Sequence, residues 1–410
     1  MPLMAAAALA IAACGSGQSH PGHVFQPGGP AVLDPAARPA VPTAKIAQSQ
    51  ISSQVVKASN GLGLKILQKD GPGRNSLVSP ISLSTALSMV ANGAAGPTQA
   101  QFRKVLGGTL GQVNTTNDAL LTIPPSRGIT LKLANSLWYG KHYHLQTTFR
   151  QALSKYYGSP ATAVDFASPS TQSLINGWVD WATKGTIPSL ASSPAPSTVA
   201  LLLNATYFMG KWENPFSKHR DSTAQFHNSS EHLSTTFMHQ TANFSYGGIR
   251  GLQHVSLPYG NGTYSMNIYL PSNLGKFLKS ATAKELSSLS SHQTSQKVIL
   301  SLPKFKLSAT SNLTSDLSSL GLSHAFGGNA NFSKLAKGGP FSISSVLQQT
   351  YIDVSEKSTV ASAVTSAVVT EMAIEAPTKP VVMNVNHPFL YTISNNRTGS
   401  ILFMGVETHP

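Results

Sequence analysis

Apolar residues recur at spacings of three and four in three stretches of the chain, and this pattern predicts amphipathic helices. The stretches are residues 45–68, 79–93 and 171–184. The second begins at Ser79, because serine is a favoured helix cap and the proline after it is tolerated in the first turn. Two glycines weaken the second half of the first stretch, and further glycines end the other two.

Stretches rich in Val, Ile, Tyr and Phe and bounded by turn residues predict β-strands. They are residues 129–139, 198–209, 263–270, 298–307, 341–354 and 388–393. Predicted helices dominate the first part of the chain and predicted strands dominate the rest. This order favours an α+β fold over a doubly wound parallel sheet.

The periodic pattern begins near residue 45, and the chain before it differs in composition. Residues 15–44 are rich in proline, glycine and alanine and show neither helical nor strand periodicity, so we expect a linker. Residues 45–410 contain no second linker, which favours one large domain. Hydrophobic residues make up 41% of the 410 residues, enough for a substantial core and too many for a disordered chain.

The first 14 residues have the pattern of a signal peptide. From Leu3 to Cys14 no side chain is polar, and this run is too short to span a bilayer but long enough for the apolar core of a signal sequence. The end of the run, Ile11-Ala12-Ala13-Cys14-Gly15, resembles the bacterial lipobox. We therefore expect export to the cell surface or the extracellular space, with a lipid anchor on Cys14 that holds the chain at a membrane. The alternative is a buried apolar N-terminus with an incidental cysteine, since no Lys or Arg precedes the run.

Charge and cysteine content exclude several classes of protein. A single cysteine rules out a disulfide framework and any multi-cysteine metal site. The net charge of +14 would suit a polyanionic partner, but no dense basic run or nucleic-acid motif accompanies it, so no nucleic-acid partner is expected.

Motifs for catalysis are also missing from the sequence. Nucleophile elbow, Walker loop, dinucleotide fingerprint and zincin helix are all absent at the correct spacing. The histidines are scattered, and the pairs His142/His144 and Glu231/His232 lack a third ligand nearby, which favours a solvated surface. We expect no catalytic residues, no metal and no cofactor; a hydrolase that uses undetected residues is the alternative.

Several segments carry a resemblance to a known family. They include NSLVSPISLSTALSMVANGAAGPTQAQF (75–102), INGWVDWATKGTIPSL (175–190), LLLNATYFMGKWENPF (201–216) and the C-terminal HPFLYTISNNRTGSILFMGVETHP. Their order and spacing are similar to those of the serpin family along nearly the whole of residues 45–410. The resemblance implies a fold of three β-sheets and about nine helices, with a metastable native state and an exposed reactive-centre loop.

The same resemblance implies a mechanism of serine protease inhibition. A protease attacks the loop as a substrate, the cleaved loop inserts as a new strand into the large sheet, and the acylated protease is carried away and distorted. The hinge of the loop would be Glu356, Lys357, Ser358, Thr359, Val360, Ala361, Ser362, Ala363 and Val364.

The chemistry of the loop suits burial. An inserted strand alternates its faces, so Thr359, Ala361 and Ala363 would share the inward side, and all three are small or β-branched and uncharged. No proline or charged residue occurs from Ser358 to Thr370, so insertion would bury no charge. The alternative is an ordinary surface loop or edge strand.

Two positions depart from the family pattern. The hinge usually has a glycine where Ser358 stands, and a hinge with less φ freedom would insert more slowly, leaving more of the loop as plain substrate. The residues that control sheet opening would be Ser79, Ser82, Asn204 and Gln348. Gln348 replaces a common histidine, and because glutamine does not titrate near neutral pH we expect no histidine-type pH dependence of opening.

The resemblance also assigns the top of the sheet and the bond that is cut. Lys304 would pair with Glu356 beside Trp212; two unrelated surface charges are the alternative. A count of seventeen residues from Glu356 places the cleaved bond between Met372 and Ala373, with a shift of one residue left open.

The residue before the cleaved bond indicates the partner. An unbranched apolar residue there suits a chymotrypsin-, elastase- or subtilisin-like serine protease with an apolar primary pocket, and a cysteine protease is a second class of target. We expect a monomeric suicide-substrate inhibitor. The alternative function is a non-inhibitory serpin-like substrate or binding protein, which Ser358 motivates.

Overall fold

The structure is a computed structural model that describes residues 50–123, 126–159, 161–190, 193–228, 232–249, 251–356 and 379–410. In this part of the chain nine α-helices and three β-sheets form, so the predicted α+β fold is confirmed. None of the described helices is both long and apolar enough to cross a membrane. The predicted signal peptide, Cys14 and the predicted linker lie outside the described residues.

The helices are α1 (Ser53–Asp70), α2 (Pro80–Ala91), α3 (Gly96–Leu106), α4 (Leu110–Leu121), α5 (Thr147–Tyr157), α6 (Pro169–Ala182), α7 (Leu274–Ser280), α8 (Ala283–Ser291) and α9 (Thr314–Leu317). The strands are β1 (Ser76–Val78), β2 (Ile129–Gly140), β3 (His144–Leu145), β4 (Ala161–Val164), β5 (Ala200–Gly210), β6 (Ser222–His227), β7 (His232–Ile249), β8 (Leu252–Tyr259), β9 (Tyr264–Pro271), β10 (Thr294–Pro303), β11 (Phe305–Asn312), β12 (Ala336–Lys337), β13 (Ser345–Val354), β14 (Val381–Asn384), β15 (Phe389–Asn395) and β16 (Ile401–Glu407).

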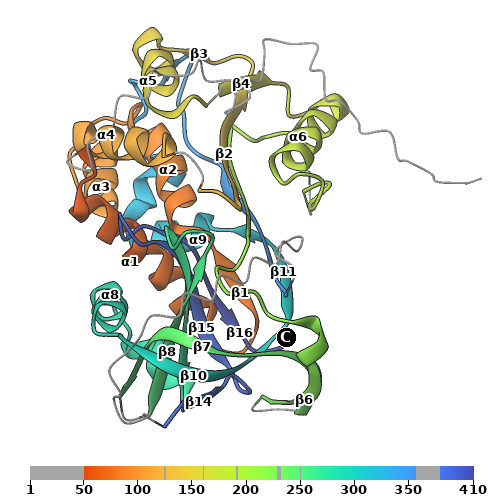
Figure 1. The fold of residues 1–410 in the computed structure, drawn as a ribbon. Coiled ribbons are helices and arrows are strands. Elements are labelled where there is room, and N and C mark those ends of the chain that lie inside the picture. Colours follow the sequence, from red (N-terminus) through yellow and green to blue (C-terminus); the bar gives the residue numbers. More distant parts are fainter. Residues whose placement is uncertain are drawn as a thin grey trace, which may run out of the picture.

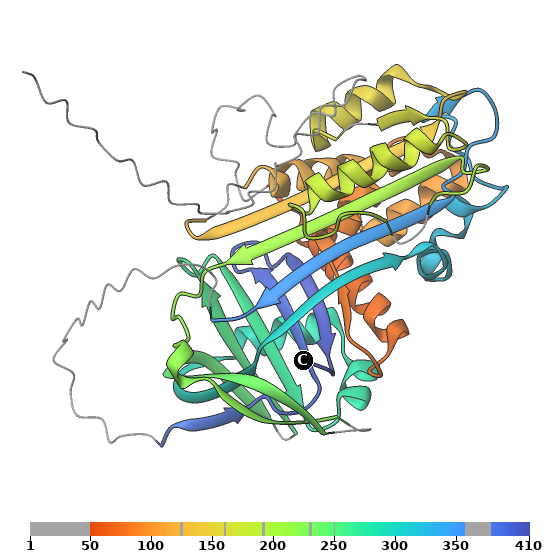
Figure 2. The same cartoon turned by 90° about the vertical axis from the view of Figure 1, so that its right-hand side faces the viewer.

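The five-stranded sheet has the order β11-β13-β5-β2-β4. Its two central neighbours, β13 and β5, run parallel, whereas β11 pairs antiparallel with β13 and β2 pairs antiparallel with β5. Helix α6 lies across one face of this sheet (Figure 2) and packs Ile175, Trp178 and Val179 against apolar side chains of β2 and β5. The other face is turned toward α2.

The nine-stranded sheet follows the order β1-β16-β15-β9-β8-β7-β10-β14, with β6 added on β7. It fills the lower part of Figure 1, whereas α2 to α5 lie in the upper part. A two-stranded sheet of β12 and β3 completes the described set. Strand β14 is an end of the nine-stranded order and pairs parallel with β10 over four residues.

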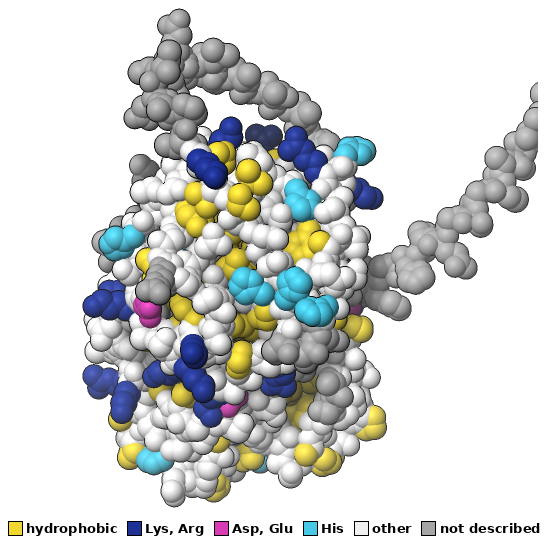
Figure 3. Space-filling model, turned by 90° about the horizontal axis from the view of Figure 1, so that it is seen from below, with side chains coloured by type: hydrophobic (Ala, Val, Ile, Leu, Met, Phe, Trp, Pro, Cys, Tyr) yellow, Lys and Arg dark blue, Asp and Glu magenta, His cyan; other side chains and the backbone are white. Residues whose placement is uncertain are grey.

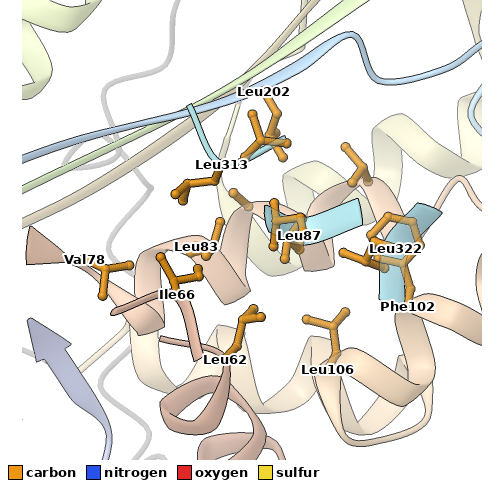
Figure 4. Packing of buried hydrophobic residues seen from close by; sticks show 14 of the residues in the cluster. Leu62, Ile66, Val78, Leu83, Leu87, Phe102, Leu106, Leu202, Leu313 and Leu322 are labelled. Atoms are coloured by element: carbon orange, nitrogen blue, oxygen red, sulfur yellow. The ribbon is translucent and has the colours of Figure 1, made fainter. Parts of the chain in front are cut away.

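Helix α2 lies at the centre of the apolar core. Leu83 and Leu87 have no exposed surface and pack with Phe102, Leu202 and residues of neighbouring elements (Figure 4). Every residue of α2 is buried, so the helix has no polar face in contact with solvent. Burial on all sides is typical of a helix inside a large protein.

One glycine of α1 has a packing role that explains its place in the helix. A Cβ atom on Gly63 would lie 2.4 Å from Cγ of Pro80, so only glycine lets α1 approach the start of α2 this closely. The glycines that weaken the sequence pattern therefore do not end α1, which continues to Asp70.

One predicted strand was wrong in extent, and one predicted helix start was right but lacks the expected capping hydrogen bond. The stretch 298–307 is two strands, because the chain leaves the nine-stranded sheet at Pro303, passes Lys304 and enters the five-stranded sheet at Phe305. Ser79 occupies the cap position of α2, but its hydroxyl makes no capping hydrogen bond. Its backbone N–H instead donates to Oε1 of Gln348, at 2.8 Å.

Candidate functional site

A buried row of polar side chains crosses the five-stranded sheet on the face toward α2. Gln348 of β13 lies opposite Asn204 of β5, and Asn204 lies opposite Asn135 of β2. All three side chains are nearly or fully excluded from solvent. Buried amides are costly unless they find hydrogen-bond partners, so their contacts with one another and with α2 determine what this row can do.

Gln348 makes one hydrogen bond across the strand pair and two to the start of α2. Its Nε2 donates to Oδ1 of Asn204 at 2.6 Å and to the carbonyl oxygen of Ser79 at 3.1 Å. Its Oε1 accepts from the backbone N–H of Ser79. The side chain therefore holds β13 both to β5 and to the buried helix beneath.

Asn204 extends the network to α2 and to β2. Its Nδ2 donates to Oγ of Ser82 and to Oδ1 of Asn135, the latter at 2.5 Å. The structure thus brings together the four residues that the sequence assigned to sheet opening, and Asn135 joins them. Sequence reasoning missed Asn135, although the register of β2 against β5, once known, would have placed it.

Just after the C-terminal end of β13 the chain reaches a cluster of three charged side chains. Nζ of Lys304 lies 2.7 Å from Oε1 of Glu356 and 2.6 Å from Oδ2 of Asp221. The side chains of Glu356 and Asp221 are only 8% and 13% exposed. Lys304 and Glu356 are therefore paired in the structure, and Asp221 is a second partner that the sequence analysis did not name.

The cluster shifts the ionisation of both acids. Burial would raise the pKa of Glu356, but hydrogen bonds with Lys304 and Asp221 outweigh burial and hold this pKa at about 2. The pKa of Asp221 is raised, because burial and the neighbouring Glu356 disfavour its charge more than Lys304 favours it. At neutral pH Glu356 is a carboxylate held by an ammonium group.

Trp212 anchors the backbone beside this cluster. Its Nε1 donates to the carbonyl oxygen of Ser355 at 3.0 Å, one residue before Glu356. The indole ring stacks on Tyr259 with 4.3 Å between ring centroids and also meets Phe216 edge-on. Trp212 and Lys304 therefore hold two successive residues at the end of β13.

The remaining predicted site residues lie outside the described part of the chain. They are the hinge residues from Lys357 to Val364 and the predicted cleavage-site residues Met372 and Ala373. Within the described ranges, no three or more His, Cys, Asp or Glu side chains are grouped so that they could hold a metal ion.

The chain matches the family model described as "Serpin (serine protease inhibitor)" over residues 59–410. It is 32% identical to the leukocyte elastase inhibitor of Homo sapiens, over 84% of this chain and 95% of that protein. It is 30% identical to an uncharacterized serpin-like protein of Thermococcus kodakarensis, over 87% of this chain and 86% of that protein. Among solved structures, the native state of the thermophilic serpin tengpin is similar with a TM-score of 0.80 and 30% identity, covering 88% of this chain and 95% of tengpin.

The chain belongs to the serpin family. Family membership supports serine protease inhibition at the level of the family and is consistent with a protein that is not itself an enzyme.

Proposed function

We propose that this serpin inhibits serine proteases as a suicide substrate, by inserting its cleaved loop between β5 and β13. The observation that carries the proposal is the parallel pairing of these two strands in the middle of the five-stranded sheet. A strand that enters antiparallel to both would replace one hydrogen-bond ladder with two. Glu356 lies two residues after the end of β13, so the proposed hinge would begin beside this strand pair.

The expected gain in free energy is large enough to drive the change. The thirteen uncharged residues from 358 to 370 span about 43 Å at ~3.3 Å each, at least the length of β5 or β13. A dozen new backbone hydrogen bonds at a net ~0.5–1.5 kcal/mol each give roughly 6–18 kcal/mol. This range overlaps the ~5–15 kcal/mol that stabilises a whole domain.

The network at Gln348 and the cluster at Lys304 would control this insertion. Separation of β13 from β5 breaks the Gln348–Asn204 hydrogen bond, while Trp212 and Lys304 hold the point where the hinge begins. The chemistry of bond cleavage belongs to the protease. This chain would contribute the loop that is cut, the β5–β13 pair that separates, and the contacts of Trp212 and Lys304 at the end of β13.

A pair of loop variants tests the proposal. Incubation with chymotrypsin-, elastase- and subtilisin-like proteases is expected to give a covalent adduct that survives denaturing electrophoresis. Ala363→Arg would place a charge on the inward side of the inserted strand and is expected to abolish the adduct while leaving cleavage intact. Val364→Arg, on the outward side, is the matched control and keeps the adduct. Clean cleavage of the wild-type chain without any adduct would instead support the non-inhibitory alternative.

We further propose that the cleaved bond joins Met372 and Ala373 and that the target has an apolar primary pocket. The elastase inhibitor named among the relatives supports this class of protease. Mass spectrometry of the released fragment locates the bond, and a cut outside residues 371–374 would contradict the count from Glu356.

We also propose that the protein is a monomer anchored at the cell surface through a lipid on Cys14. The apolar run before Cys14 and the linker of residues 15–44 support this proposal. Metabolic labelling with a radioactive fatty acid is expected to label the wild-type chain and not the Cys14→Ser variant. Equal labelling of both would refute the anchor.

A further inference from the structure

Two histidines far from the strand gap meet at the end of the β6–β7 hairpin. His227 ends β6 and His232 begins β7, and the two are directly opposite in the antiparallel ladder. Their Nδ1 atoms lie 3.0 Å apart and share a hydrogen bond whose donor depends on the tautomer, with the rings nearly perpendicular at 82°. The two histidines are five positions apart in the sequence, and the pairing of β6 with β7 brings their ring nitrogens together.

We propose that His227 and His232 form a binding site for a divalent transition metal, with Cu(II) as the preferred ion. Neutral imidazole nitrogen is the commonest side-chain ligand for such ions. Metal–nitrogen bonds of about 2.0–2.1 Å at an angle near 90–95° place two nitrogens about 2.9–3.1 Å apart. The ion would replace the proton that the two Nδ1 atoms share, which are 3.0 Å apart before the ion binds.

The general order of affinity of divalent ions for nitrogen ligands favours Cu(II) over Ni(II) and Zn(II), so Cu(II) is the ion that we expect to bind most tightly.

Both side chains are exposed, so the remaining coordination positions are open to water. Figure 3 shows histidine side chains gathered on the face seen from below. Two protein ligands with water at the other positions would make an exchangeable site, unlike the closed coordination of a structural centre.

A metal ion at this place would bind where the β6–β7 hairpin contacts two other segments, one after β14 and one near the C-terminus. The backbone N–H of His227 donates to the carbonyl oxygen of Asn386, which follows the end strand β14, at 2.7 Å. Nδ2 of Asn228 donates to the carbonyl oxygen of Thr408 near the C-terminus at 3.2 Å. By closing the hairpin, the ion would also steady both attached segments, and a ligand that binds the folded state stabilises it by mass action.

Isothermal titration of the intact full-length chain with copper(II) chloride, nickel(II) chloride and zinc chloride tests the site. We expect Cu(II) to bind most tightly. Loss of even the outer-shell partners of metal ligands costs about 10–100-fold in affinity, so His227→Ala and His232→Ala should each weaken Cu(II) binding by at least about tenfold. The control is His219→Ala, which removes an exposed histidine in the turn of residues 218–220 and should leave the affinity unchanged.

Electron paramagnetic resonance and thermal unfolding test the same site by two further measurements. Electron paramagnetic resonance of the Cu(II) complex should show two coordinated nitrogens in the wild-type chain and fewer in either variant. Excess Cu(II) should raise the melting temperature of the wild-type chain and not that of His232→Ala. Unchanged affinity in both alanine variants, or an equal loss in His219→Ala, would overturn the assignment. The test needs no protease, so its outcome is independent of the proposed inhibition.

Discussion

Replacing Gln348 with leucine should destabilise the intact protein through two orphaned polar groups. Gln348→Leu keeps the side chain's approximate size but removes its three hydrogen bonds. The carbonyl oxygen of Ser79 keeps its bond from Leu83 in α2, so the groups left without a partner are the Ser79 N–H and Oδ1 of Asn204. At about 1–3 kcal/mol for each buried unsatisfied group, the loss is roughly 2–6 kcal/mol.

The neighbouring residue provides a matched control. Gln349 is equally buried, but its Nε2 has no hydrogen-bond partner among the described residues, and its Oε1 accepts only from the exposed Thr310. Gln349→Leu removes an unsatisfied group and one hydrogen bond whose donor can turn to water. We therefore expect a change of within about 1 kcal/mol.

Urea-induced unfolding of the intact chain, followed by tryptophan fluorescence, measures both variants. The account predicts a lower midpoint for Gln348→Leu and a nearly unchanged midpoint for Gln349→Leu. Equal losses in the two variants would show that any polar-to-apolar change in this sheet is harmful, and that the Gln348 network has no special part in holding β13 to β5.

Two further substitutions probe the charged groups. Lys304→Met leaves Asp221 and Glu356 without their cation and should lower the free energy of unfolding by about 2–4 kcal/mol at pH 7, with part of the loss recovered as acid protonates the carboxylates. The control is Lys306→Met, which should cost under about 1 kcal/mol because the pair of Lys306 with Asp353 is well exposed. Similar losses for the two variants in chemical denaturation would contradict the reasoning. Burial raises the pKa of Glu407 from its ordinary 4.5 to about 7, so its ionisation destabilises the fold as pH rises from 4.5 through 7, by about 3 kcal/mol at most. Glu407→Gln should therefore melt higher than wild type at pH 8 but not at pH 4.5, and a gain that is the same at both pH values would exclude this cause.

Local patterns predicted the elements whose burial is regular. The start of α2 followed from Ser79 and the proline after it, and the hydrophobic run of β5 marked a strand buried on both faces. The alternation of apolar residues changes phase at Pro303-Lys304, from even positions in β10 to odd positions in β11, which marks an irregularity. The change of sheet itself could not be predicted, because it depends on tertiary packing.

The partners of the site residues depend on contacts between distant segments. Asp221 lies 83 positions before Lys304, and no local pattern connects them. The sequence analysis paired His232 with Glu231 and did not name His227, because the His227–His232 pair follows from hairpin register. The family resemblance named Ser79, Ser82, Asn204 and Gln348, which lie together in the structure, whereas Asn135 and Asp221 could be found only in the structure.

We propose that the intact fold is not the arrangement of lowest free energy and that cutting the loop releases the difference. The most direct measurement compares the melting temperature of the intact chain with that of the chain cut once within residues 358–373 by a protease that forms no adduct. The account predicts that the cut form melts far higher, because its loop has become a strand between β5 and β13. Equal or lower melting of the cut form, with the loop still open to further proteolysis, would contradict it.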